Sequence, residues 1–183
     1  EKQLEALNAE LENRVAERTA ELAKSLEDAN KANAAIAYLA DHDALTGLLN
    51  RQRFQEELNR WVKYSLRHNH PMALMFLDMD KFKNINDNYG HPAGDEFLSS
   101  VATLLKNTLR STDYIARWGG DEFVALLPET DTVAACEVAA KLGRVFGSTP
   151  ITLSGHNVYP SASMGVAVLP DHTTDCNELI AFA

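Results

Sequence analysis

The sequence predicts an α+β domain with a mainly antiparallel sheet flanked by helices, preceded by one long helix. Beyond residue 50, helix and strand patterns alternate, with two adjacent strands in the middle, an order typical of α+β domains. Two glycines between apolar stretches indicate a β-hairpin, and the first forty residues contain neither Gly nor Pro. We therefore divide the chain into a helical segment, 1–40, and a domain, 41–183, that is long enough for one packed core.

Apolar periodicity places the elements of the domain. The expected helices cover about residues 51–68, 93–109, 131–146 and 175 onward, and the expected strands cover about residues 72–78, 113–118, 122–128 and 157–168. The segment Asn84–Phe97 is rich in Asn, Asp and Gly, so we expect a loop there that leads into the second of these helices.

The predicted hairpin carries two acids at its tip. The run Arg117–Phe123 reads Arg-Trp-Gly-Gly-Asp-Glu-Phe, so Asp121 and Glu122 follow the turn glycines. Glycines allow a ligand to approach the backbone closely, and neighbouring carboxylates suit a hard cation such as Mg²⁺ that carries phosphate oxygens. Taken alone, this segment is better explained as a hairpin with solvated acids.

A second acidic position lies upstream, where the apolar run Met72–Leu77 ends in Asp78. A continuous apolar run is typical of a strand that is buried on both faces. An aspartate at the exit of such a strand is costly to desolvate without a cation or hydrogen bonds, which favours a metal site. Met79 can contribute only its backbone carbonyl, and we expect a structural role for Asp80.

Three polar residues further on have ordinary explanations when each is taken singly. Asn86 fits a turn asparagine, His91 a hydrogen-bonded loop residue, and Asp95 a favourable charge near a helix N-terminus.

Four blocks in order resemble one known family, the GGDEF-domain diguanylate cyclases. The blocks are Asp43–Arg51, Asp78–Lys83, Asn86–Asp95 and the Gly119–Phe123 signature. The resemblance covers roughly residues 41–183. A five-letter match arises by chance, whereas four blocks at the family's spacing do not.

The resemblance implies a palm-like fold of the nucleotide cyclase type and the condensation of two GTP into cyclic di-GMP with release of two pyrophosphates. It implies that Asp78 and Asp121 bind Mg²⁺ or Mn²⁺, assisted by the Met79 carbonyl and by Glu122. Divalent cations neutralise charge in such phosphoryl transfers. Asp121 is also the family's candidate for accepting the proton of the attacking 3′-hydroxyl, although a carboxylate is a weak base unless a metal first acidifies that hydroxyl.

The resemblance also assigns the nucleotide contacts. Lys83, with the nearby backbone N–H of Phe82, matches the phosphate contact. Asn86 and Asp95 match the guanine readers, because a carboxylate accepts from both N1–H and the exocyclic amine of guanine, a pattern that adenine does not offer. His91 matches a position near the nucleotide, with support of the loop as an equal alternative.

Arg110 and Asp113 match the family's RxxD motif, which implies an inhibitory site for the product, cyclic di-GMP. An arginine pairs with phosphate or stacks on guanine, while an aspartate binds a guanine edge. On its own this pattern is usually a salt bridge at a helix end. Lys141 or Arg144 on the next helix can add positive charge there.

The first forty residues fit a heptad pattern. The main frame contains Leu4, Leu11, Val15, Leu22, Ala29, Ala32, Ile36 and Leu39, with Asn8, Arg18 and Ser25 as polar members, and a competing frame uses Thr19, Leu26 and Asn33. We expect a parallel coiled coil about 60 Å long. It would hold a homodimer, since the implied reaction needs two GTP molecules facing each other. A single solvated helix is the alternative.

Composition sets further bounds. The formal net charge of −9 leaves no basic footprint and argues against a nucleic-acid partner. The two cysteines lack the spacing of a metal site and fit free thiols in a reducing compartment. Because neither a membrane-spanning segment nor a signal peptide is evident, we expect a cytoplasmic location, while the parent protein can still be anchored to the inner membrane.

Both ends of the chain carry expectations of their own. It begins without Met inside the heptad pattern, so we expect an upstream sensor domain that is absent here. Family members usually continue the last helix into a segment whose basic residues contact the nucleotide phosphates, so we expect a domain that is truncated at its C-terminal end. The alternatives to a diguanylate cyclase are a regulatory module that binds GTP or cyclic di-GMP and, more remotely, a cyclase that makes cGMP.

Overall fold

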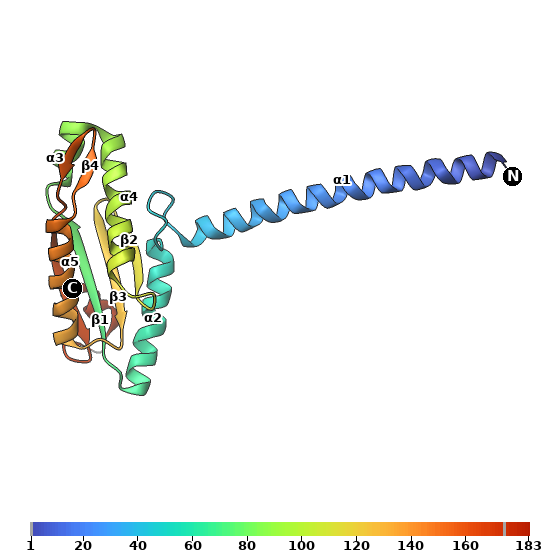
Figure 1. Ribbon diagram of the computed structural model, residues 1–183. Coiled ribbons are helices and arrows are strands. Elements are labelled where there is room, and N and C mark those ends of the chain that lie inside the picture. Colours follow the sequence, from blue (N-terminus) through green and yellow to red (C-terminus); the bar gives the residue numbers. More distant parts are fainter. Residues whose placement is uncertain (1, 174) are drawn as a thin grey trace. The chain divides into compact units, whose positions relative to one another are not determined.

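The structure is a computed structural model that describes residues 2–173 and 175–183 (Figure 1). Contacts within the chain divide it into two units, Glu1–Ala40 and Asp41–Ala183. The second unit contains every strand that the structure describes, together with the residues assigned to the candidate site.

Helix α1 (Lys2–Asp41) is one continuous helix of 40 residues. Large apolar side chains along its described part are exposed, with Leu22 70 %, Leu26 64 % and Ile36 65 % accessible to solvent. Leu22 and Ile36 belong to the main heptad frame and Leu26 to the competing one, so members of both frames lie on the surface of the single chain. The predicted long N-terminal helix is confirmed, and its pairing into a coiled coil stays a prediction.

The domain has an α+β fold, as predicted. Its helices are α2 (Arg51–His68), α3 (Phe82–Tyr89), α4 (His91–Thr108), α5 (Thr132–Ser148) and α6 (Cys176–Phe182), and its strands are β1 (Met72–Met79), β2 (Tyr114–Gly119), β3 (Glu122–Pro128), β4 (Ile151–Leu153), β5 (His156–Val158) and β6 (Ala162–Leu169). Four strands form one antiparallel sheet in the order β2-β3-β1-β6, and β4 and β5 form a separate hairpin.

Strand β1 is central, and its alternating side chains build both halves of the core (Figure 1). Met72 and Leu74 pack with residues of α2 and α6 on one face. Met75 and Leu77 pack with residues of α4 and α5 on the other. Burial on both faces explains why this strand is a continuous apolar run in the sequence. Asp78 and Met79 form the end of this strand, where Asp78 pairs with Glu122 of β3.

The expected loop at Asn84–Phe97 is wrong, because most of it is helical. Helix α3 begins at Phe82, and Gly90, with φ +85°, separates it from α4, which already begins at His91. Phe82, Ile85 and Tyr89 form an apolar stripe that packs on the core. This tertiary packing outweighs the turn preference of the intervening Asn and Asp residues.

The single strand expected at 157–168 is also wrong. The structure has β5 and β6 there, separated by a break around Pro160, and β4 was not predicted. Ser154 and Gly155 both have positive φ and form the turn that joins β4 to β5. Strands of three residues are too short for an alternation pattern to identify.

Over the described ranges, none of the helices is long and apolar enough to cross a membrane. Cys136 is exposed, Cys176 is half-buried, and both are free thiols, as predicted.

Candidate active site

Two acids lie directly opposite each other at one end of the sheet. Asp78 in β1 pairs with Glu122 in β3, so the two side chains emerge on the same face. Like charges in this position destabilise a strand pair, and a bound cation would remove the repulsion. Asp78 is exposed, so the expectation that its desolvation requires a cation is wrong: the residues on either side of Asp78, Leu77 and Met79, are buried, but Asp78 itself reaches solvent. The argument for a cation rests instead on the opposed charges.

The predicted hairpin is confirmed, but the expected turn residues Gly119 and Gly120 are wrong by one position. Gly119 ends β2 and pairs with Glu122, which leaves Gly120 and Asp121 as the two turn residues, so the turn itself adds a third acid. Gly120 has φ +53°, in the left-handed region that favours glycine. The Met79 N–H donates to the Asp121 carbonyl over 3.2 Å, which ties the turn to the end of β1. A Cβ built on either glycine would meet no atom within 4 Å, so open space surrounds this turn.

The residues at this end of the sheet offer hard oxygen donors. They are the carboxylates of Asp78, Asp121 and Glu122 and the carbonyl of Met79. Within residues 2–173 and 175–183, no three His, Cys, Asp or Glu side chains converge into a closed metal cage. Mg²⁺ is commonly held by one or two carboxylates together with substrate phosphates. An open set of carboxylates therefore fits a cation that binds together with a nucleotide.

The segment after β1 has a geometry that suits phosphate. Lys81 has φ +58° and stands at the N-cap of α3 without a capping side-chain hydrogen bond. The first N–H groups of a helix lack partners inside the helix, and phosphate oxygens commonly take that place. Phe82 and Lys83 are the first two residues of α3, and the Lys83 side chain is exposed.

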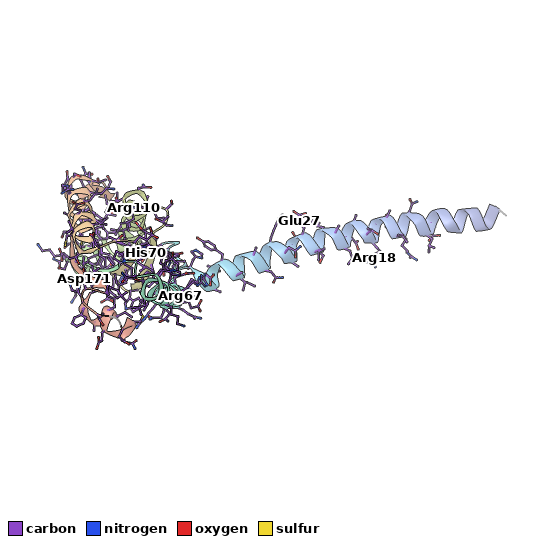
Figure 2. All side chains as sticks on the ribbon, turned by 90° about the horizontal axis from the view of Figure 1, so that it is seen from below. Arg18, Glu27, Arg67, His70, Arg110 and Asp171 are labelled. Carbon is purple, nitrogen blue, oxygen red and sulfur yellow. The ribbon has the colours of Figure 1, made fainter. Side chains whose placement is uncertain are left out.

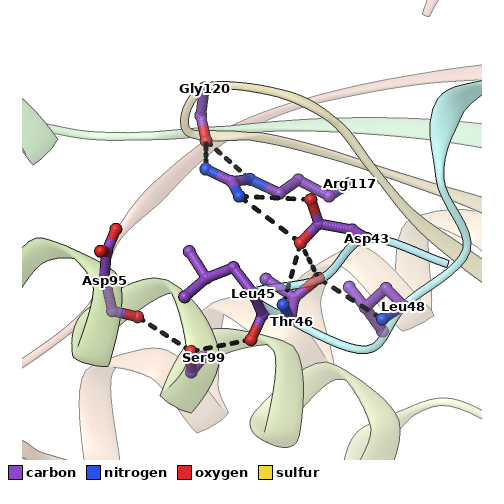
Figure 3. A network of polar contacts seen from close by, with 8 residues as sticks. All are labelled: Asp43, Leu45, Thr46, Leu48, Asp95, Ser99, Arg117 and Gly120. Carbon is purple, nitrogen blue, oxygen red and sulfur yellow. Dashed lines mark hydrogen bonds and ion pairs between the residues drawn. The ribbon is translucent and has the colours of Figure 1, made fainter. Parts of the chain in front are cut away.

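The two predicted guanine readers lie on neighbouring helices. The Asn86 side chain of α3 lies against Gly94 of α4, so closely that a Cβ on Gly94 would sit 2.0 Å from Asn86 Oδ1. Asp95 follows Gly94, and its carboxylate projects from α4 (Figure 3). His91 is exposed at the start of α4. The structure therefore brings Asn86 next to the residue that precedes Asp95.

Arg110 and Asp113 close a compact loop between α4 and β2. Asp113 Oδ2 accepts from the Arg110 N–H over 2.8 Å, and the Asp113 N–H donates to the Arg110 carbonyl over 3.0 Å. Burial raises the pKa of Asp113, although the Arg110 N–H and the Arg110 charge act in the opposite direction. The Arg110 side chain is on the surface (Figure 2). A helix-end salt bridge, the ordinary explanation, is not among the ion pairs of the described residues.

A cavity of about 490 Å³ lies between this loop and α5. Arg110, Asp113, Lys141 and Arg144 contribute to its lining, so three cationic side chains surround it. Lys141 Nζ donates to the Thr108 carbonyl over 2.8 Å, which fixes α5 against the end of α4. The two additional cations that the sequence suggested therefore line the same cavity as the RxxD pair.

Sequence analysis missed a polar network that reaches the signature turn (Figure 3). Arg117 Nε and Nη2 donate to the Gly120 carbonyl over 3.0 and 2.8 Å, and Nη1 lies 3.4 Å from both carboxylate oxygens of Asp43. The Thr46 N–H and hydroxyl donate to Asp43 Oδ1. Burial alone would raise the pKa of Asp43, but the Thr46 hydrogen bonds and the Arg117 charge outweigh it and lower this pKa. The signal available in the sequence was an arginine two residues before the signature.

Comparison with known proteins places this fold and site in a family. The family described as diguanylate cyclase, GGDEF domain, matches residues 40–183. The chain belongs to this GGDEF-domain family.

Individual proteins similar to this chain support its membership in this family. The chain is 39 % identical over 170 residues to MucR of Pseudomonas aeruginosa, a bifunctional diguanylate cyclase/cyclic di-GMP phosphodiesterase, which covers 93 % of this chain and 24 % of MucR. It is 40 % identical over 142 residues to the diguanylate cyclase TpbB of the same organism, covering 76 % of this chain and 32 % of TpbB. The chain thus spans about a quarter to a third of the length of these curated relatives.

Solved structures resemble both parts of the chain. The GGDEF domain of TpbB from Pseudomonas aeruginosa superposes with a TM-score of 0.73 at 38 % identity, over 76 % of this chain and 82 % of that one. The coiled coil and GGDEF domain of DgcB from Caulobacter crescentus, solved with c-di-GMP, gives a TM-score of 0.77 at 25 % identity, over 93 % of this chain and 88 % of that one.

Proposed function

We propose that this chain is a diguanylate cyclase that condenses two GTP into cyclic di-GMP and releases two pyrophosphates. The observation that carries the proposal is the opposed pair Asp78 and Glu122 with Asp121 in the adjoining turn, beside a helix start suited to phosphate. Membership in the GGDEF-domain family and the similarity to TpbB support the same activity.

The acids of the sheet end would hold Mg²⁺ or Mn²⁺. Asp78 and Asp121 are the main ligands in this proposal, assisted by Glu122 and the Met79 carbonyl. When bound, the divalent cation neutralises phosphate charge and acidifies the attacking 3′-hydroxyl. In this proposal Asp121 accepts that proton, and its position in an open turn, where a second nucleotide can approach, supports the assignment.

The nucleotide would lie along α3 and α4. The first N–H groups of α3 and the Lys83 ammonium bind phosphate oxygens, which positions the α-phosphate near Asp78 at the end of the preceding strand. Asn86 and Asp95 bind the guanine edge, and Asp95 accepts from two guanine donors that adenine lacks. His91 at the start of α4 is the remaining nucleotide contact.

The active form would be a homodimer. One domain carries one set of nucleotide contacts, and the condensation needs two GTP molecules whose 3′-hydroxyls face each other's α-phosphates. The exposed apolar residues of α1 provide a surface for pairing, since burial of this stripe stabilises a long amphipathic helix. The likeness to the DgcB structure, which includes a coiled coil, supports this arrangement.

Product inhibition would act through the cavity beside the RxxD loop. Arg110 pairs with a product phosphate and Asp113 binds a guanine edge, while Lys141 and Arg144 add positive charge from α5. The DgcB structure was solved in complex with c-di-GMP, which supports a product site on this type of domain.

The direct test is to identify what the purified chain makes from GTP. We expect cyclic di-GMP by mass spectrometry in the presence of Mg²⁺, and none with a chelator. Asp121→Asn should abolish synthesis, whereas Glu129→Gln, beyond the other end of the same hairpin strand, should leave it unchanged. Formation of cGMP would overturn the proposal, and GTP binding without any product would favour a regulatory module instead.

A further inference from the structure

The segment that follows α1 contacts both halves of the candidate active site. We call residues 42–49 the junction loop, because it joins the last residue of α1 to α2. It contacts the rest of the domain at two places, near the signature turn and at α4 (Figure 3).

The junction loop contacts the signature turn through Arg117. The Arg117 backbone N–H donates to the Leu49 carbonyl over 3.1 Å, so the loop holds this strand residue by its main chain. Asp43 holds the guanidinium at Nη1, and the remaining Nε and Nη2 donate to the Gly120 carbonyl. Asp43 and Arg117 are largely buried, with side chains 23 % and 18 % exposed. The pair is therefore much less accessible to competing water than a surface ion pair.

The contact to α4 reaches the helix that carries a proposed guanine reader. The Ser99 hydroxyl lies 3.2 Å from the Leu45 carbonyl and 2.9 Å from the Asp95 carbonyl. About two turns further along α4, Lys106 Nζ donates to the Gly47 carbonyl over 3.0 Å. These bonds fix the junction loop to a regular helix, so the position of the loop residues that contact Arg117 is well defined.

The signature turn depends on such hydrogen bonds for its position, because few side chains pack against it. Gly119 and Gly120 have no side chains, and no atom lies within 4 Å of a Cβ built on either. Glycine also has the largest backbone freedom to lose on ordering. The Arg117 bonds to the Gly120 carbonyl and the Met79 bond to the Asp121 carbonyl hold the turn on its two sides.

We propose that Arg117 is the positioning residue of the catalytic turn and that Asp43 acts through it, so that the junction loop sets the placement of Asp121. The proposal rests on the proposed cyclase function. Asp43 lies two residues beyond the last residue of α1. The Arg117 side chain alone lies between the Asp43 carboxylate and the Gly120 carbonyl of the turn, and it bonds to both.

Arginine is needed here because one side chain must serve two partners at once. Its planar fork presents Nη1 to the carboxylate and Nε with Nη2 to the carbonyl. A lysine has a single ammonium and cannot hold both partners in this geometry. Arg117→Lys therefore keeps the charge but should no longer hold the Asp43 carboxylate and the Gly120 carbonyl together.

The test combines turnover with substrate binding in Arg117→Ala, Arg117→Lys and Asp43→Asn. We expect kcat for cyclic di-GMP synthesis to fall by about 100-fold in both Arg117 variants and by about 10-fold in Asp43→Asn, because a small misplacement of a reacting group has effects of this size. Binding of 3′-deoxy-GTP with Mg²⁺, which cannot react, should stay within about twofold of wild type.

Arg53→Ala is the matched control. Arg53 on α2 is also a partly buried arginine that pairs with a buried carboxylate, Glu57. It pairs with Asp41 at the end of α1 as well, but the ion pairs of Arg53 among the described residues include none to the turn. It should lower the melting temperature and leave kcat unchanged. If Arg117→Ala and Arg53→Ala lower stability and kcat in the same proportion, Arg117 is merely structural.

Two further measurements separate this proposal from the function on which it rests. In spectra of ¹⁵N-glycine-labelled protein, Arg117→Lys and Asp43→Asn should shift or broaden the Gly120 amide signal and leave Gly143 in α5 unmoved, whether or not the chain turns over GTP. The double variant Asp43→Asn/Arg117→Ala should be no slower than Arg117→Ala. An unmoved Gly120 signal would overturn the proposal even in an active cyclase. So would a double variant whose loss in kcat is the sum, in free energy, of the losses in Asp43→Asn and Arg117→Ala.

Discussion

Replacing Gly94 by alanine should separate helix stability from substrate recognition. Gly94 lies in α4, where alanine is favoured over glycine by about 0.5–1 kcal/mol. The new Cβ would stand 2.0 Å from Asn86 Oδ1 and 3.3 Å from Phe82 Cζ, so the Asn86 side chain must rotate away. Because the atom displaced is the end of a flexible side chain, the domain should fold with little or no loss of stability.

The displaced Asn86 can no longer bind guanine in its original position. A lost or unsatisfied hydrogen bond of this kind costs about 1–3 kcal/mol, which corresponds to a dissociation constant raised by about 5- to 150-fold. The expected result is a melting temperature near or above that of the wild type together with weaker binding of 3′-deoxy-GTP. Equilibrium binding in the presence of Mg²⁺ and thermal unfolding measure the two quantities.

Gly143→Ala is the control for this experiment. Gly143 lies in α5, and a Cβ there meets nothing within 4 Å, so this variant receives the gain in helix propensity alone. Its nucleotide affinity should equal that of the wild type. If Gly94→Ala binds 3′-deoxy-GTP as tightly as Gly143→Ala does, Asn86 is not a guanine reader and the reasoning from the Asn86–Gly94 contact is refuted.

Four further outcomes are expected. Asp78→Asn should abolish turnover while leaving the melting temperature unchanged or higher, since it removes a carboxylate opposite Glu122; residual synthesis above a few per cent would contradict its role as a ligand. Arg110→Ala should give progress curves that stay linear as cyclic di-GMP accumulates. Because burial raises the pKa of Asp113 above 3.8, inhibition should be strongest above that raised pKa and weaken as the pH falls through it; an unchanged inhibition constant across that range would argue against a role for its carboxylate. A variant limited to 41–183 should show specific activity that rises with protein concentration, whereas the full chain should vary less, provided α1 dimerises.

Local patterns in the sequence identified much of this domain. The helix at 51–68 and the hairpin around Gly119–Gly120 agree with the structure, because periodicity and turn preference are properties of neighbouring residues. The same reasoning failed where packing overrides local preference, as in α3, and where strands are too short to show alternation, as in β4 and β5.

The arrangement of the candidate site depended on tertiary structure. The blocks that resemble the GGDEF-domain family could be recognised from sequence, but the register that sets Asp78 opposite Glu122 depends on which strands become neighbours. The contact of Asp43 with Arg117 joins residues 74 positions apart. No local pattern in the sequence encodes this contact. It forms because the junction loop packs between β2 and α4, which brings the Asp43 side chain to Arg117 only in the folded domain.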